Sequence, residues 1–216
     1  MNILNQYKRV KQNIEDYSVN IPANLIVVTK GRSLADIQKI INVGHIHFGE
    51  NRVQESINKW KDILKTNTDI KLHFIGKLQT NKVGDVIPHF SFIHSLDNDK
   101  LALKLSAEEK KFKKTLDYFV QVNLGEENQK SGILKQDLSR FIKYCKNDLN
   151  LNIIGLMCLP PINEDSDKYF KELRQLAFDN NLKELSMGMS NDYVPAIKNG
   201  STFVRIGSGI FEEEFN

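Results

Sequence analysis

Short apolar runs alternate with longer amphipathic segments along this chain of 216 residues. Runs rich in β-branched and aromatic residues predict buried strands, whereas apolar residues at a period of about 3.6 predict helices. We expect eight strands, at 25–30, 45–49, 72–75, 92–95, 118–123, 153–157, 184–187 and 202–206. We expect helices near 2–16, 33–44, 51–65, 79–86, 98–111, 135–147, 169–177 and 191–199.

Eight strands that alternate with helices predict a closed (β/α)₈ TIM barrel in the α/β class. An open doubly wound sheet is the alternative, but it usually needs fewer strands, and no G-x-G-x-x-G motif follows the first strand. No linker rich in proline, glycine or serine divides the chain. We therefore expect a single domain over residues 1–216, with the helix at 2–16 as an addition to the barrel.

Composition narrows the class of protein. The chain is 40% hydrophobic and 26% charged, which is enough to bury a substantial core. Its net charge of +3 is too small to indicate nucleic-acid or membrane binding. Cys145 and Cys158 lie far apart and match no metal spacing, which favours a reducing compartment. Because the first residues do not resemble a signal peptide and no apolar run approaches ~18 residues, we expect a soluble cytoplasmic protein.

A lysine ends the first expected strand. Lys30 follows the apolar run at 25–28 and immediately precedes Gly31. Apolar walls around its amine would disfavour the ammonium form, and a neutral amine can attack an aldehyde to form a Schiff base. The alternative is a solvated lysine that merely ends a strand, because most lysines are exposed.

The carboxyl ends of the strands in a barrel of this type meet at one mouth. The residues expected there are mostly polar or glycine: Lys30, 49–51, 76–77, Ser95, Asn123, Met157, 188–190 and 205–208. Because the strands themselves are apolar, this concentration of polar residues and glycines at their ends indicates a ligand site at the mouth.

The loops after the seventh and eighth strands are rich in glycine and serine. They contain Gly-Met-Ser at 188–190 and Gly-Ser-Gly at 207–209. Loops at these places often bind phosphate in such barrels. Ser190 is placed to cap the helix near 191–199, whose N-terminus favours an anion, and Ser208 offers a hydroxyl donor. The alternative is two ordinary glycine turns, with Ser190 as a plain helix cap.

A Schiff-base lysine beside a phosphate site suits either pyridoxal phosphate or the phosphorylated sugar of an aldolase. Arg205 leaves the last strand beside the second glycine loop. Its guanidinium stays charged and can hold a phosphate, or it can donate a hydrogen bond to a pyridine nitrogen and keep that nitrogen unprotonated. A structural salt bridge is the third interpretation.

Several ordered motifs closely resemble those of the pyridoxal phosphate homeostasis proteins, also called the proline-synthase co-transcribed family. They include VVTK at 27–30, FGEN at 48–51, HFIG at 73–76, LQTNK at 78–82, LSMGMS at 185–190 and VRIG at 204–207. The resemblance extends over essentially the whole chain. It implies a single barrel like the N-terminal domain of alanine racemase, with pyridoxal 5′-phosphate held as a reversible Schiff base.

The resemblance also implies a set of cofactor-binding residues, with no catalytic residue and no metal ligand. They are Lys30, Asn51, Met157, Ser190, Arg205, Gly207 and Ser208. Lys30 would carry the Schiff base, and Arg205 would face the pyridine nitrogen. The serines and Gly207 would contact the phosphate, while Asn51 and Met157 would line the pocket.

Members of this family are regarded as carriers or regulators of the vitamin B6 pool, so we expect storage and delivery of the cofactor without turnover. Its recipients would be pyridoxal phosphate-dependent apo-enzymes. Alanine racemase-like enzymes need a further β domain and a catalytic tyrosine, which we do not expect from this chain. A monomer is expected, because a barrel closes its own sheet. The alternative is a lone-barrel racemase or phosphosugar aldolase, which requires a proton shuttle near Lys30.

Departures from the family pattern include Arg52 in place of a common tyrosine, and Gly31-Arg32-Ser33 in place of Thr-Lys-Pro. The loop around Lys130 is charged and suits plain solvation, although the resemblance raises a role in cofactor exchange. The histidines do not form a metal set, and we expect them to make solvent or loop contacts; they are His45, His47, His73, His89 and His94.

Overall fold

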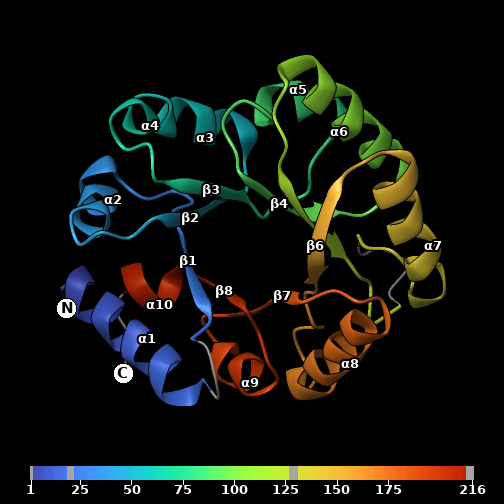
Figure 1. Ribbon diagram of the computed structural model, residues 1–216. Helices are drawn as coiled ribbons and strands as arrows, with labels where there is room; N and C mark the ends of the chain where they lie inside the picture. The colour runs from blue at the N-terminus through green and yellow to red at the C-terminus, as the bar shows by residue number, and fades with distance from the viewer. Residues whose placement is uncertain (1, 19–21, 127–130, 213–216) are drawn as a thin grey trace.

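Eight parallel strands close into a barrel in the computed structural model, which describes residues 2–18, 22–126 and 131–212 (Figure 1). The strands follow one another around the barrel in chain order, and β1 pairs with both β2 and β8. They are β1 (Asn24–Val28), β2 (His47–Glu50), β3 (Lys71–Phe74), β4 (Phe92–Leu96), β5 (Asp117–Gln121), β6 (Asn152–Met157), β7 (Glu184–Met189) and β8 (Phe203–Ile206). The predicted (β/α)₈ barrel is therefore confirmed.

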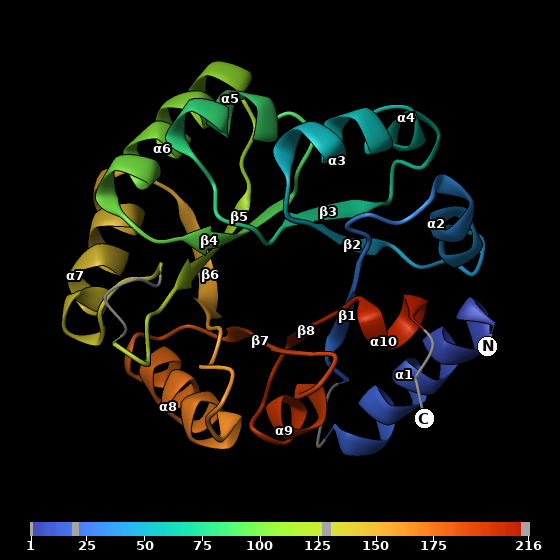
Figure 2. The ribbon, with the colours of Figure 1, turned by 180° about the vertical axis from the view of Figure 1, so that it is seen from behind.

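Helices surround this barrel on the outside, as the view from behind also shows (Figure 2). They are α1 (Ile3–Tyr17), α2 (Leu34–Ile41), α3 (Val53–Trp60), α4 (Ile63–Thr66), α5 (Val83–Val86), α6 (Asp99–Phe112), α7 (Leu138–Lys143), α8 (Ser166–Asp179), α9 (Tyr193–Lys198) and α10 (Ser208–Phe211). Helix α1 precedes the first strand and packs against α2, α9 and α10, which confirms the added N-terminal helix. Among the described residues, no helix is both long and apolar enough to cross a membrane.

Some element boundaries differ from the prediction. Strand β1 ends at Val28, two residues before the expected end at Lys30. The helix expected at 135–147 consists of a 3₁₀ turn at Lys135–Asp137, helix α7 and a π-helical segment at Tyr144–Asp148. Periodicity locates the apolar face of such segments but is insensitive to the hydrogen-bond pattern of each turn.

Buried side chains form two layers. The larger apolar cluster joins the outer faces of the strands to the helices, through residues such as Phe48, Trp60 and Phe141. A smaller cluster consists of Ile26, Phe92, Phe119, Met157 and Phe203. Because successive side chains of a strand point to opposite faces, each strand serves both layers.

Candidate ligand-binding site

A cavity of about 700 Å³ opens at the carboxyl ends of the strands, where the sequence predicts a ligand site. It is lined by residues after β1, β2, β3, β6, β7 and β8. Six of the seven predicted cofactor-binding residues lie around it: Lys30, Asn51, Ser190, Arg205, Gly207 and Ser208. Met157 does not line this cavity; it is 1% exposed and belongs to the small apolar cluster with Ile26 and Phe119.

The Lys30 side chain lies in the turn after β1 and is exposed to solvent. We expected apolar walls to desolvate its amine, and this expectation is wrong. The reason is the early end of β1 at Val28, which carries the chain beyond the apolar strand before it reaches Lys30. The amine is therefore solvent-exposed at the edge of the cavity that Lys30 helps to line.

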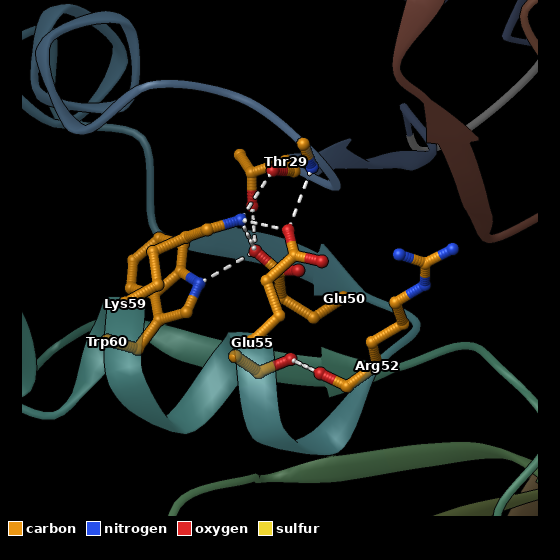
Figure 3. A network of polar contacts seen from close by, with 8 residues as sticks. Thr29, Glu50, Arg52, Glu55, Lys59 and Trp60 are labelled. Carbon is orange, nitrogen blue, oxygen red and sulfur yellow. Dashed lines mark hydrogen bonds and ion pairs between the residues drawn. The ribbon is translucent and has the colours of Figure 1, made fainter.

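The turn that carries Lys30 is held by a network around the carboxylate of Glu50, which is fully buried (Figure 3). One oxygen, Oε1, accepts hydrogen bonds from Thr29 Oγ1 at 2.6 Å, Lys59 Nζ at 2.9 Å and Trp60 Nε1 at 2.9 Å. Lys59 and Trp60 come from α3, so this helix anchors the residue that immediately precedes Lys30.

The same network holds the backbone on both sides of Lys30. Lys59 Nζ donates to the Thr29 carbonyl oxygen at 2.7 Å, and the Gly31 N–H donates to Glu55 Oε1 at 2.9 Å. The Gly31 hydrogen bond and the neighbouring Lys59 lower the pKa of Glu55. We call Thr29, Glu50, Glu55, Lys59 and Trp60 the lysine clamp. It fixes the backbone of the turn while the Lys30 side chain projects from it.

The loops after β7 and β8 are tied together by Ser190. Its Oγ accepts a hydrogen bond from the Gly209 N–H at 3.1 Å. The expectation that Ser190 caps the following helix is wrong, because the N-cap of α9 is Asp192. Asp192 Oδ1 instead accepts from the Met189 N–H at 2.6 Å, which closes the loop after β7. These bonds bring Ser190 to the same side of the cavity as Gly207 and Ser208.

Asn51 supplies a polar atom without a partner. Its Oδ1 is buried and accepts no hydrogen bond from any described residue. Gly76 allows the loop after β3 to approach closely, since a Cβ there would lie 2.3 Å from the Asn51 carbonyl oxygen. A buried acceptor that lines a cavity is available to a ligand donor, because leaving it unpaired costs free energy.

Arg205 lies on β8, the strand next to β1, and is only 4% exposed. Its NH1 group donates to Ser186 Oγ at 2.5 Å, and its NH2 group donates to the Cys158 carbonyl oxygen at 3.1 Å. Burial lowers the pKa of this guanidinium from its usual value. No carboxylate of a described residue forms an ion pair with it, so the structural salt bridge considered above is not formed there.

The histidines are placed differently from the prediction. His73 and His94 are fully buried, and both rings pack against Phe203 and Phe92 instead of making solvent contacts. The sequence does contain a signal for this placement. His73 and His94 lie within two successive strands, and side chains of a strand point alternately into the barrel and toward the helices, so a histidine inside a strand can be buried. Within residues 2–18, 22–126 and 131–212, no group of three metal-ligating side chains gathers at one place. Lys130 lies outside the described residues.

Comparisons with known proteins agree with this geometry. Residues 5–214 match the family model of the alanine racemase N-terminal domain. The pyridoxal phosphate homeostasis protein of Pasteurella multocida is 36% identical over 197 residues, which cover 87% of this chain and 84% of that protein. PipY of Synechococcus elongatus PCC7942, solved with PLP bound, superposes with a TM-score of 0.87 at 30% identity, over 97% of this chain and all of PipY.

A more distant likeness concerns the fold alone. Alanine racemase from Corynebacterium glutamicum superposes with a TM-score of 0.76 at 14% identity. The match covers 99% of this chain and 61% of the racemase.

Proposed function

This chain belongs to the family of pyridoxal phosphate homeostasis proteins, and we propose that it binds pyridoxal 5′-phosphate (PLP) reversibly at Lys30 to store and deliver it. One observation carries the proposal. A primary amine, a buried guanidinium and two serine–glycine loops converge on one cavity of about 700 Å³. PLP combines an aldehyde, a ring nitrogen and a phosphate in one molecule, so this donor set fits it.

Each part of the cavity has its own task. Ser190, Gly207 and Ser208 hold the phosphate, with the serine hydroxyls as donors and the glycine leaving room for close approach. Asn51 Oδ1 accepts a hydrogen bond from a ligand donor. When bound, PLP supplies an aldehyde carbon that a primary amine can attack with release of water. Lys30 supplies that amine, on a backbone that the lysine clamp holds still.

Arg205 decides what the bound cofactor can do. Two of its nitrogens are used within the protein, and its remaining N–H donors are available to a ring nitrogen in the cavity. A guanidinium does not give up its proton near neutral pH, so the ring nitrogen stays unprotonated. A ring held in this way would be a poorer electron sink than one paired with a carboxylate, which favours storage over amino-acid turnover.

The carboxylates around the cavity also support storage. Glu164 binds Lys168, Glu212 binds Arg32, and Asp192 accepts from the Met189 N–H. Each of these groups is already engaged, and none is hydrogen-bonded to Lys30. We therefore propose that the protein stores PLP and passes it to PLP-dependent apo-enzymes. We propose that it does so as a monomer, because the barrel closes its own sheet.

A PLP titration followed by visible spectroscopy tests the binding proposal. We expect the wild type to develop the absorption band of a lysine-bound cofactor, and Lys30→Ala to develop none. The matched control is Lys77→Ala, because Lys77 is exposed but does not line the cavity. A band of full strength in Lys30→Ala contradicts the proposal.

Storage and turnover are separated by incubating the PLP-loaded protein with amino acids in deuterated water. We expect no sustained exchange of the α-proton, and we expect an apo-enzyme to regain activity when it is mixed with the loaded protein. Steady exchange with turnover would instead favour the racemase alternative.

A further inference from the structure

A continuous line of hydrogen-bonded side chains runs from Arg205 to the opposite end of the barrel. Arg205 NH1 lies 2.5 Å from Ser186 Oγ, which lies 2.8 Å from His94 Nδ1. His94 Nε2 lies 2.9 Å from His73 Nδ1, and His73 Nε2 lies 2.9 Å from His47 Nδ1. The line crosses β8, β7, β4, β3 and β2, and we call its four members other than Arg205 the histidine chain.

The far end of the histidine chain reaches solvent. His47 lines a second cavity of about 770 Å³, which lies beside α1 at the amino ends of β1 and β2. Its ring packs near Phe92 and Phe203, at centroid distances of 6.3 and 6.0 Å. Water in this second cavity can accept a hydrogen bond from the N–H at His47 Nε2, so the chain ends at solvent on this side and at the buried guanidinium on the other.

The buried guanidinium fixes the direction of every hydrogen bond. A guanidinium can only donate, so Ser186 Oγ must accept from Arg205. No other described group contacts Ser186 Oγ, so its own proton has only His94 Nδ1 to go to. If His94 Nδ1 were protonated, the buried serine proton would have no acceptor, and an unpaired buried donor is costly.

The direction of the first hydrogen bond determines the direction of the bonds between the histidines. A neutral imidazole donates from one nitrogen and accepts at the other. His94 accepts at Nδ1 and so donates from Nε2 to His73 Nδ1, and His73 in turn donates from Nε2 to His47 Nδ1. We propose that the histidine chain is one-way, with His47, His73 and His94 neutral and protonated at Nε2, and that it positions Arg205 for the ring nitrogen of the ligand.

Two further features fit this arrangement. The rings are held in plane by stacking, with His73 on Phe92 at 4.2 Å and 7°, and His94 on Phe119 at 4.3 Å and 16°. Burial lowers the pKa of His47 to about 4 and holds the pKa of His73 and His94 well below the usual range, so all three are neutral near pH 7.

The chain also compensates the charge of Arg205. Each group in it turns its acceptor end toward the guanidinium, and aligned dipoles in a low-dielectric interior strengthen one another. The neighbouring Cys158 thiol is neutral, because burial raises its pKa to about 12. Arg205 thereby remains a cation without an ion pair, and a neighbouring carboxylate is not needed to hold it.

The first experiment measures imidazole ¹⁵N shifts and one-bond N–H couplings in the full-length protein without PLP, at pH 7. We expect His47, His73 and His94 to be Nε2–H tautomers. His89 lies outside the chain on the partly exposed segment after α5 and serves as the internal control that titrates. An Nδ1–H tautomer at any of the three, or titration of His73 or His94 near neutral pH, overturns the one-way chain.

The second experiment compares two serine-to-alanine variants. Ser186→Ala disconnects Arg205 from the chain, whereas Ser201→Ala removes another buried hydroxyl, which bonds only to carbonyl oxygens of β7 and β8. We expect Ser186→Ala to bind PLP about tenfold more weakly and to let His94 populate both tautomers. Ser201→Ala should keep the wild-type PLP affinity and the wild-type His94 tautomer.

This positioning role rests on the proposed PLP function, and the two fail in different ways. If the wild type binds no PLP, the proposed function fails, while the tautomers still test the chain. If the wild type binds PLP and both serine variants bind it equally, the positioning role fails and the proposed function stands. If Ser186→Ala does not fold, the tautomers of the wild type still decide whether the chain is one-way.

Discussion

Two adjacent walls of the cavity, one at the end of β1 and one at β8, hold their key residues by different means. On one wall the Lys30 side chain is exposed, and a charged network of Glu50, Glu55 and Lys59 holds the backbone beneath it. On the other wall the Arg205 side chain is 4% exposed, and uncharged groups hold the guanidinium itself. The Lys30 amine has to reach an aldehyde carbon, which requires a fixed backbone and an unrestrained side chain. The Arg205 guanidinium has to donate to one ring atom, which requires the guanidinium itself to be held in place.

The difference begins with the position of each residue in its strand. Lys30 lies beyond the end of β1, whereas Arg205 lies inside β8, between Val204 and Ile206. A side chain inside a barrel strand is surrounded by its neighbours and must find partners there. A side chain beyond the strand end does not need them, so only its backbone has to be held.

The largest expected effect on stability comes from the charged wall. Glu50→Gln leaves Lys59, whose side chain is 9% exposed, without its main counter-charge. We expect the free energy of unfolding to fall by about 3 kcal/mol in urea titrations, because breaking one half of a buried ion pair strands the other half. The matched control is Asp62→Asn, which removes a fully exposed partner of Lys65 and should cause no measurable change. Equal stability of the two variants contradicts the clamp.

Acidification should destabilise the other end of the barrel, where His45 lines the second cavity. Burial lowers the pKa of His45 to about 4, and its Nε2 donates to the His47 carbonyl oxygen at 2.7 Å. The unfolded chain therefore takes up the proton near pH 6.5, before the folded protein does, and stability falls as pH decreases from about 6.5 to about 4. His45 alone should account for about 2 kcal/mol between pH 7 and pH 5.

Urea unfolding at a series of pH values measures this loss. His45→Gln should reduce the slope of the free energy of unfolding against pH, because one proton fewer is taken up on unfolding. By contrast, Glu55 has a lowered pKa, so its contribution is present above the pKa of the unfolded chain and is lost only at more acidic pH. His89→Gln is the comparison: burial also lowers the pKa of His89, but this side chain is only partly buried, so its loss should reduce the slope by less. Identical slopes in His45→Gln and the wild type would show that this histidine is not held neutral by the fold.

Arg205→Lys tests whether the guanidinium on the β8 side of the cavity contributes to PLP affinity. A lysine keeps the charge but cannot donate to Ser186, Cys158 and a ring nitrogen in one plane. We expect PLP to bind about tenfold more weakly, which corresponds to about 1.4 kcal/mol, in a spectroscopic titration. Unchanged affinity would remove the guanidinium from the site.

Glu55→Gln should give the smallest effect, because the Glu55 side chain is 31% exposed. We expect a loss of about 0.5 kcal/mol in stability, and a faster hydrogen exchange at the Gly31 N–H, which donates to Glu55 Oε1. An unchanged exchange rate at Gly31 would mean that the turn is held by Lys59 and Glu50 without Glu55.

The sequence predicts the barrel and the mouth well, because strand ends follow directly from the apolar runs. Lys30, Asn51, Ser190 and Arg205 come together for that reason alone. Partners of individual side chains are harder to predict, since they depend on the register between strands. The histidine chain needs a stagger of two residues at each step: His73 lies two residues beyond the β3 partner of His47, and His94 lies two residues beyond the β4 partner of His73. Met157 was expected to line the pocket but lies in the small apolar cluster, and the Ser190 hydrogen bond was not predicted, because side-chain direction at a strand or loop end is set by tertiary packing.

The most direct test of the site is to trap the cofactor where it binds. The full-length protein is incubated with PLP, reduced with borohydride, digested and mapped by mass spectrometry. The geometry of the two walls predicts a phosphopyridoxyl adduct on Lys30, with Lys59 and Lys77 unmodified. An adduct on another lysine, with Lys30 intact, would contradict the central claim.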